Sequence, residues 1–160
     1  MALKNISLLL SQLEQLKEHI PNQAATRDTV SKSSVGWHIE HTLLTINQVI
    51  AAVKRSSPRD YKWTFSFLRW VILTTRKIPR GRGQSPSSVQ PGAFNFQTLN
   101  THAYVTGEQI KELPVIREDK FFEHPFFGKL RLKATVRFLE IHTQHHLHII
   151  HDILQTSVKL

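Results

Sequence analysis

The sequence predicts an all-α protein, a helical bundle formed by one domain over residues 1–160. Several long segments repeat apolar residues with a period of about 3.6, which places those residues on one face of a helix. No segment alternates apolar and polar residues for more than a few positions, as a half-buried strand would. Amphipathic helices without strands bury their apolar faces against one another, so a bundle around a single core is expected.

The first two helices are predicted from their apolar periodicity and from signals at their ends. A first helix is expected over residues 5–19, because apolar residues recur at helical spacing and Pro21 follows. A second helix should begin at a serine cap, either Ser33 or Ser34, and should end near Ser56.

A third helix is expected over residues 61–76, where aromatic side chains are unusually dense. The aromatic residues are Tyr61, Trp63, Phe65, Phe67 and Trp70. Aromatic clusters of this density are typical of cores and interfaces rather than of surfaces that stack on bases. We therefore expect this helix to cover the bundle or to pair with a second subunit, and we predict a homodimer.

The following loop, residues 76–92, is rich in Pro, Gly and cations. Its basic residues are Arg76, Lys77, Arg80 and Arg82. It is either a solvated connection, a clamp for an anion beside a functional site, or a weak contact for nucleic acid. No nucleic-acid-binding motif accompanies it, so nucleic acid is not the expected partner.

The C-terminal half predicts two more helices with an aromatic connector between them. One helix is expected over residues 95–113, ended by Pro114, and the last over residues 130–156. The connector, residues 121–128, reads FFEHPFFG. Its phenylalanines cannot all remain in water, so we expect it to fold over the bundle as a cap and to carry His124 to the mouth of the bundle.

Composition limits the chemistry that this chain can perform. With no cysteine there is no disulfide, thiolate ligand or cysteine nucleophile. Neither a signal-peptide apolar region nor a membrane span is found, so a soluble cytoplasmic protein without a membrane partner is expected. The formal net charge of +9 favours anionic partners, from phosphate or carboxylate substrates to nucleic acid.

Five of the ten histidines lie in the predicted last helix. His146 falls within its apolar stripe and His142, four residues earlier, falls at the edge of the stripe, so the two rings are neighbours on the inward side. Two imidazoles at this spacing can hold one metal ion, although hydrogen-bonded core histidines are the alternative. A metal site would need a third ligand.

The predicted second helix carries two further histidines, His38 and His41. His41 lies roughly opposite the aliphatic stripe, so periodicity alone predicts an exposed residue. Trp37 and Leu44 make that side partly apolar as well. A helix with two apolar faces can contact two neighbours or line a cleft, so the role of His41 stays open at this point.

Five short strings together resemble one known family. SVGWHIEH at 34–41 resembles the W-S-x-x-x-x-x-x-H segment on the second helix of the DinB-like metal-binding four-helix bundles. IHTQHHL at 141–147 resembles the H-x-x-H-H segment on their last helix. The strings PRGRG, HPFFG and RFLEIHTQHH, at 79–83, 124–128 and 137–146, resemble a branch of that superfamily known only as a domain of unknown function. The tryptophan of the first segment is replaced here by serine.

This resemblance implies a fold and a metal site. The implied fold is an up-down-down-up bundle, whose long connection between the second and third core helices holds the aromatic helix and the basic loop. The implied metal ligands are His41, His142 and His146. Their imidazoles favour Zn or Ni, with Fe or Mn as alternatives. Characterised relatives include metal-dependent transferases and isomerases that use low-molecular-weight thiols, and here any thiol must come from outside the chain.

Two functions are compatible with these observations. The first is a metal-dependent enzyme that activates a thiol cosubstrate or water for transfer or hydrolysis on a small molecule. The second is a non-catalytic, metal-binding or structural stress-related bundle. Candidates for a catalytic base are His38, His124 and His145, and candidates for binding an anionic substrate are Arg80 and Arg82.

Overall fold

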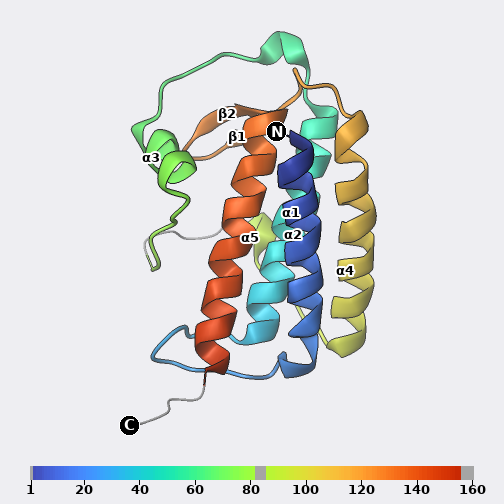
Figure 1. Cartoon of the computed structure of the whole chain (residues 1–160), viewed down its shortest axis with the longest axis vertical. Helices are drawn as coiled ribbons and strands as arrows, with labels where there is room; N and C mark the ends of the chain where they lie inside the picture. The colour runs from blue at the N-terminus through green and yellow to red at the C-terminus, as the bar shows by residue number, and fades with distance from the viewer. Residues whose placement is uncertain (1, 82–85, 156–160) are drawn as a thin grey trace.

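Four long helices pack side by side in the computed structural model, which describes residues 2–81 and 86–155 (Figure 1). They are α1 (Ala2–Glu18), α2 (Val35–Arg55), α4 (Phe96–Lys111) and α5 (Leu132–Leu154). α1 and α2 each contact both α4 and α5. α1 and α5 run in one direction along the bundle and α2 and α4 run in the other. The prediction of a mostly helical protein is confirmed.

Side-chain caps explain where two of these helices begin. Ser34 caps α2, because its Oγ accepts a hydrogen bond from the backbone N–H of Trp37. Asn95 and Thr98 form a reciprocal capping box at the start of α4. The observed ends lie within three residues of those expected for all four helices.

The core contains the apolar stripes that the sequence predicts. On α2, for example, Ile39, Leu43 and Ile46 have no exposed surface, and on α5 Leu139 and Ile150 have none. None of the helices in the described ranges is long and apolar enough to cross a membrane.

The predicted third helix is too long. α3 spans only Phe67–Thr75, and residues 61–66 before it are not helical. Contacts with the later chain hold this segment: Lys129 donates a hydrogen bond to the carbonyl of Asp60, and the Arg131 guanidinium lies 4.2 Å from the centre of the Tyr61 ring. Tertiary contacts therefore override the helical pattern here.

A β-hairpin replaces the irregular connector expected before the last helix. β1 (Phe121–His124) pairs antiparallel with β2 (Gly128–Arg131), with His124 opposite Gly128. Gly128 has a φ of +69°, which glycine adopts without strain. The strands have four residues each, so their alternation was too short to predict a hairpin. Phe121 and Phe127 are buried, as expected of a cap.

The basic loop is fixed to α5 at its beginning. Arg76 ends α3 in the left-handed region, with a φ of 58°, and its guanidinium forms an ion pair with the buried carboxylate of Glu140. Lys77 is exposed. The loop is therefore a connection that contacts the bundle at Arg76, and not one that is solvated throughout.

Gly36 lets the Phe94 side chain and the Gln23 backbone lie close to the start of α2. We expect Gly36→Ala to lower the free energy of unfolding by about 1–2 kcal/mol. A Cβ there would lie 2.4 Å from Cε2 of Phe94 and 3.0 Å from the Gln23 carbonyl oxygen. The free-energy cost of this steric clash should exceed the stabilisation of about 1 kcal/mol that alanine gives over glycine within a helix. Urea unfolding checks this. Gly107→Ala on α4 is the control, because its Cβ would meet only the Leu13 side chain, at 3.3 Å. Equal effects of the two substitutions would contradict the prediction.

Candidate metal centre

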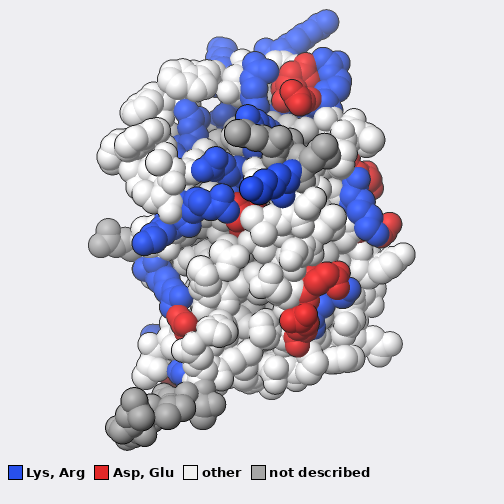
Figure 2. Space-filling model, in the orientation of Figure 1, with Lys and Arg blue, Asp and Glu red and all other residues white. Residues whose placement is uncertain are grey.

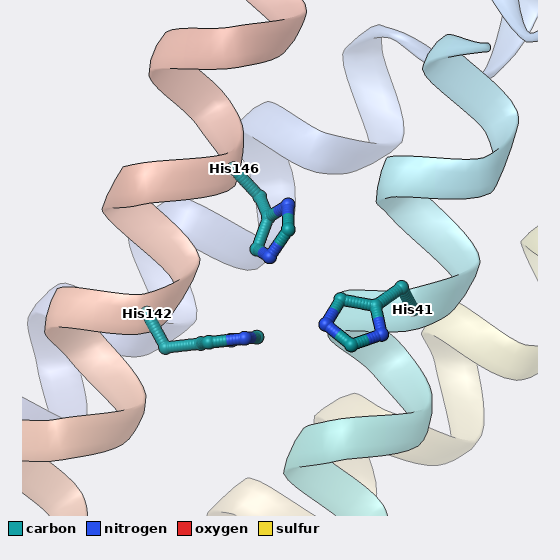
Figure 3. A group of neighbouring side chains, drawn as sticks. All are labelled: His41, His142 and His146. Carbon is teal, nitrogen blue, oxygen red and sulfur yellow. The ribbon is translucent and has the colours of Figure 1, made fainter. Parts of the chain in front are cut away.

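Three histidines from two helices converge between α2 and α5 (Figure 3). We call His41, His142 and His146 the histidine triad. One ring nitrogen of each lies within 4.8 Å of those of the other two. An ion at the centre of three nitrogens that are 4.8 Å apart would lie about 2.8 Å from each nitrogen. Zinc–nitrogen bonds are ~2.1 Å long, so each ring would have to move about 0.7 Å toward the ion. The triad therefore fits a single divalent ion.

The burial of His41 contradicts the expectation from periodicity. The side chain is only 3% exposed. Its ring stacks on Trp37, with centroids 5.0 Å apart, and the short helical turn η3 (Ser87–Val89) covers it from outside. Residues near the end of the basic loop thus cover the second apolar face of α2, which becomes one wall of the site.

One hydrogen bond fixes the tautomer of His41. Its Nδ1 lies 2.8 Å from the carbonyl oxygen of Val89, so Nδ1–H donates and carries the ring proton. Nε2 then keeps its lone pair. Metal-binding histidines commonly donate their second N–H to a carbonyl or carboxylate in this way, which fixes the tautomer and the ring orientation.

His142 has an unpaired polar atom inside the protein. Its Nδ1 is buried and has no hydrogen-bond partner within residues 2–81 and 86–155. Buried polar atoms are nearly always paired, so an unpaired one needs a physical reason. A bound metal ion at the triad would account for it if Nδ1 is the ligand atom.

His146 is held by a chain of two further side chains. Its Nδ1 lies 3.0 Å from Nδ1 of His38, and Nε2 of His38 lies 2.9 Å from Oγ of Ser31. If His146 binds metal through Nε2, its Nδ1–H donates to His38, and His38 Nε2–H donates to Ser31. His38 is therefore placed behind a ligand and orients it.

Burial keeps these rings neutral. It is the largest cause that lowers the pKa of His41, and it holds the pKa values of His142 and His146 well below 6.5. Neighbouring imidazoles lower the last two further. Burial also lowers the pKa of His38 to about 4. Neutral imidazoles are the form that binds metal, so the site offers nitrogen lone pairs at neutral pH.

Two other predicted residues lie beside the triad. The His145 ring contacts that of His146, with centroids 5.1 Å apart, and burial followed by the charge of Arg80 lowers its pKa to about 4. Arg80 also lowers the pKa of His38 and forms an ion pair with Asp152 at 2.8 Å. Arg80 is therefore near the histidines but already has an anionic partner. Arg82 lies outside the described residues.

His124 is close to the triad but is not part of it. Its ring stacks on Phe127, with centroids 3.9 Å apart, and it packs against the edge of Phe138, which in turn contacts His142. Its Nδ1 accepts a hydrogen bond from the backbone of Phe126. The hairpin thus places His124 one aromatic layer away from the histidine triad.

The carboxylates nearest in sequence to the triad have other partners. Glu40 contacts His102 at 2.9 Å, and Glu140 pairs with Arg76. The arrangement can hold a divalent ion in a neutral environment, and it offers no obvious carboxylate base among the described residues. Comparison with protein-family models, with curated proteins and with solved structures gives no match.

Proposed function

We propose that this chain is a metal-dependent enzyme of the DinB-like superfamily, which binds one divalent ion through His41, His142 and His146 and acts on a small molecule. The observation that carries the proposal is the convergence of three neutral imidazole nitrogens within 4.8 Å. The Val89 carbonyl behind His41 and the unpaired Nδ1 of His142 support it independently.

The proposed chemistry needs a nucleophile from outside the chain, which has no cysteine. When bound, a divalent ion supplies Lewis-acid chemistry that lowers the pKa of a small-molecule thiol or of water. The protein fixes the three rings, of which His41 and His146 are buried and His142 is half-buried. Zn or Ni fits these ligands best, and Fe or Mn is tolerated. Arg80 is the cation placed to bind an anionic group of the substrate, in exchange for Asp152.

A second proposal is a metal-binding bundle without catalysis. It is favoured by the carboxylates of Glu40 and Glu140, both of which are engaged with cationic or hydrogen-bonding partners. His38 is likewise engaged, since both of its ring nitrogens have partners. His145 is then the remaining candidate for a base near the triad.

The deciding experiment measures metal in protein purified without a metal-affinity tag or added metal. About one equivalent of a transition metal, lost in a variant with His41, His142 and His146 all replaced by Ala, supports the site. A screen for thiol-dependent transfer then separates the two proposals. Stoichiometric metal without any thiol- or water-dependent turnover favours the non-catalytic bundle. Metal retained in the triple variant would refute the site.

A further inference from the structure

An unusual number of large aromatic side chains face solvent beside α3. Trp63, Phe65, Phe67, Trp70 and Phe126 are each between 57% and 69% exposed. We call these five residues the aromatic edge. Soluble monomers rarely expose a contiguous apolar surface of this kind unless it binds something.

Contacts with the hairpin hold the aromatic edge in place. Arg69 donates a hydrogen bond to the carbonyl of Phe127, and Ser66 donates one to that of Phe126. α3 itself lies outside the four-helix bundle, and Ile72 is its one fully buried residue (Figure 1). The aromatic rings therefore belong to a protruding element, and Trp63, Phe65 and Trp70 line an open groove on its surface.

Cations accompany the aromatic edge. Residues 59–77 contain five Lys or Arg and one acidic residue. The Arg69 guanidinium lies 5.7 Å from the centre of the Trp63 ring. Among the described residues, Lys62 and Lys77 are exposed and form no salt bridge, so their charges are available to a partner, whereas the Arg69 guanidinium donates to backbone carbonyls but has no carboxylate partner. Figure 2 shows Lys and Arg side chains gathered next to the protruding white surface, at the upper left.

We propose that the aromatic edge and its cations bind the surface of an anionic lipid bilayer. Trp and Phe rings are stable at the boundary between headgroups and acyl chains, while Lys and Arg beside them attract anionic headgroups. Surface binding needs no membrane-spanning helix, so it is compatible with the absence of a span from the described helices.

A second copy of the chain fits this surface less well. Two-fold pairing would put the same positively charged patch of both subunits into one interface. Like charges in contact oppose association. The homodimer predicted from the aromatic residues of this segment is therefore the alternative that the test must distinguish from membrane binding.

The test is cosedimentation of the full chain with vesicles of phosphatidylcholine alone or with about 30% phosphatidylglycerol. Binding should be at least ten-fold tighter to the anionic vesicles and should weaken with salt. Changing Trp63 and Phe65 to Ser, or Lys62 and Lys77 to Glu, should each reduce binding about ten-fold or more.

Matched substitutions on other faces are the controls. Tyr104→Ser removes an exposed aromatic ring from α4, and Lys32→Glu together with Lys111→Glu reverses two exposed charges elsewhere. Both should bind vesicles as the unchanged chain does. Equal binding of edge and control variants would overturn the proposal. A dimer of the unchanged chain in light scattering, with twice the 18.5 kDa of one chain, would also overturn the proposal if the Trp63 and Phe65 variant is a monomer of 18.5 kDa.

Discussion

Replacing any one of the triad histidines by alanine is expected to lower affinity for Zn²⁺ on the order of a hundred- to a thousand-fold. In the proposed site each ring supplies one of three protein ligands, and the nearby carboxylates of Glu40 and Glu140 are paired with His102 and Arg76 instead. Competition with a chromogenic chelator measures the affinity, and circular dichroism checks that each variant is folded.

His148 provides the control for this series, because it lies on the same helix with an exposed side chain. His148→Ala should leave affinity unchanged. His38→Ala should lower Zn²⁺ affinity by about ten- to a hundred-fold, less than the triad substitutions and more than His148→Ala. The reason is that His38 contacts His146 and would not bind the metal itself. A loss for His148→Ala as large as that for His146→Ala would mean that the metal binds on the outer face of α5.

The bundle was predictable because its information is local. Each long helix carries its own apolar stripe, and α2 and α4 carry their own start signals, the Ser34 cap and the Asn95 capping box. The pairing of His142 with His146 follows from helical geometry for the same reason, since residues four apart face the same way. These features need no knowledge of the rest of the chain.

His41 shows where local information ends. Its burial depends on η3, whose Val89 lies 48 residues later in the chain and accepts the hydrogen bond from Nδ1. No periodicity on α2 could reveal that cover, and only the resemblance of residues 34–41 to a family motif pointed to His41. The roles of Val89 and Ser31 had no sequence signal, because a backbone carbonyl and a loop hydroxyl carry no motif.

The region around α3 was predicted least well. Aromatic density suggested a longer helix with a buried face, whereas residues 61–66 are not helical and the hairpin contacts the chain at Asp60 and Tyr61. The density instead supplies an exposed edge, with Trp63 and Phe65 facing solvent. Whether an aromatic residue faces the core or solvent depends on which long-range partner is present, and composition alone does not determine that.

The metal-free protein is expected to lose stability steeply as the pH falls from 6.5 to about 4. Burial lowers the pKa values of His38, His124 and His145 from 6.5 to about 4, so these rings are neutral in the folded state. The unfolded chain binds their protons near pH 6.5 and the folded chain does not. Their contribution to stability is therefore complete above pH 6.5 and is lost as the pH falls toward 4.

The contribution of His124 to this pH dependence can be measured separately. His124 is not part of the histidine triad, and its pKa is lowered by burial. A shift from 6.5 to about 4 corresponds to at most about 3 kcal/mol, and partial exposure of the ring reduces this. His124→Asn removes the titrating group and keeps an acceptor for the Phe126 N–H. Urea unfolding in EDTA should then show a loss of unfolding free energy between pH 7 and pH 5 that is smaller by about 1–2 kcal/mol. His148→Asn, at an exposed position, should leave that loss nearly unchanged. An unaltered pH dependence in His124→Asn would show that this ring is charged in the folded protein, and hence that the hairpin does not bury it.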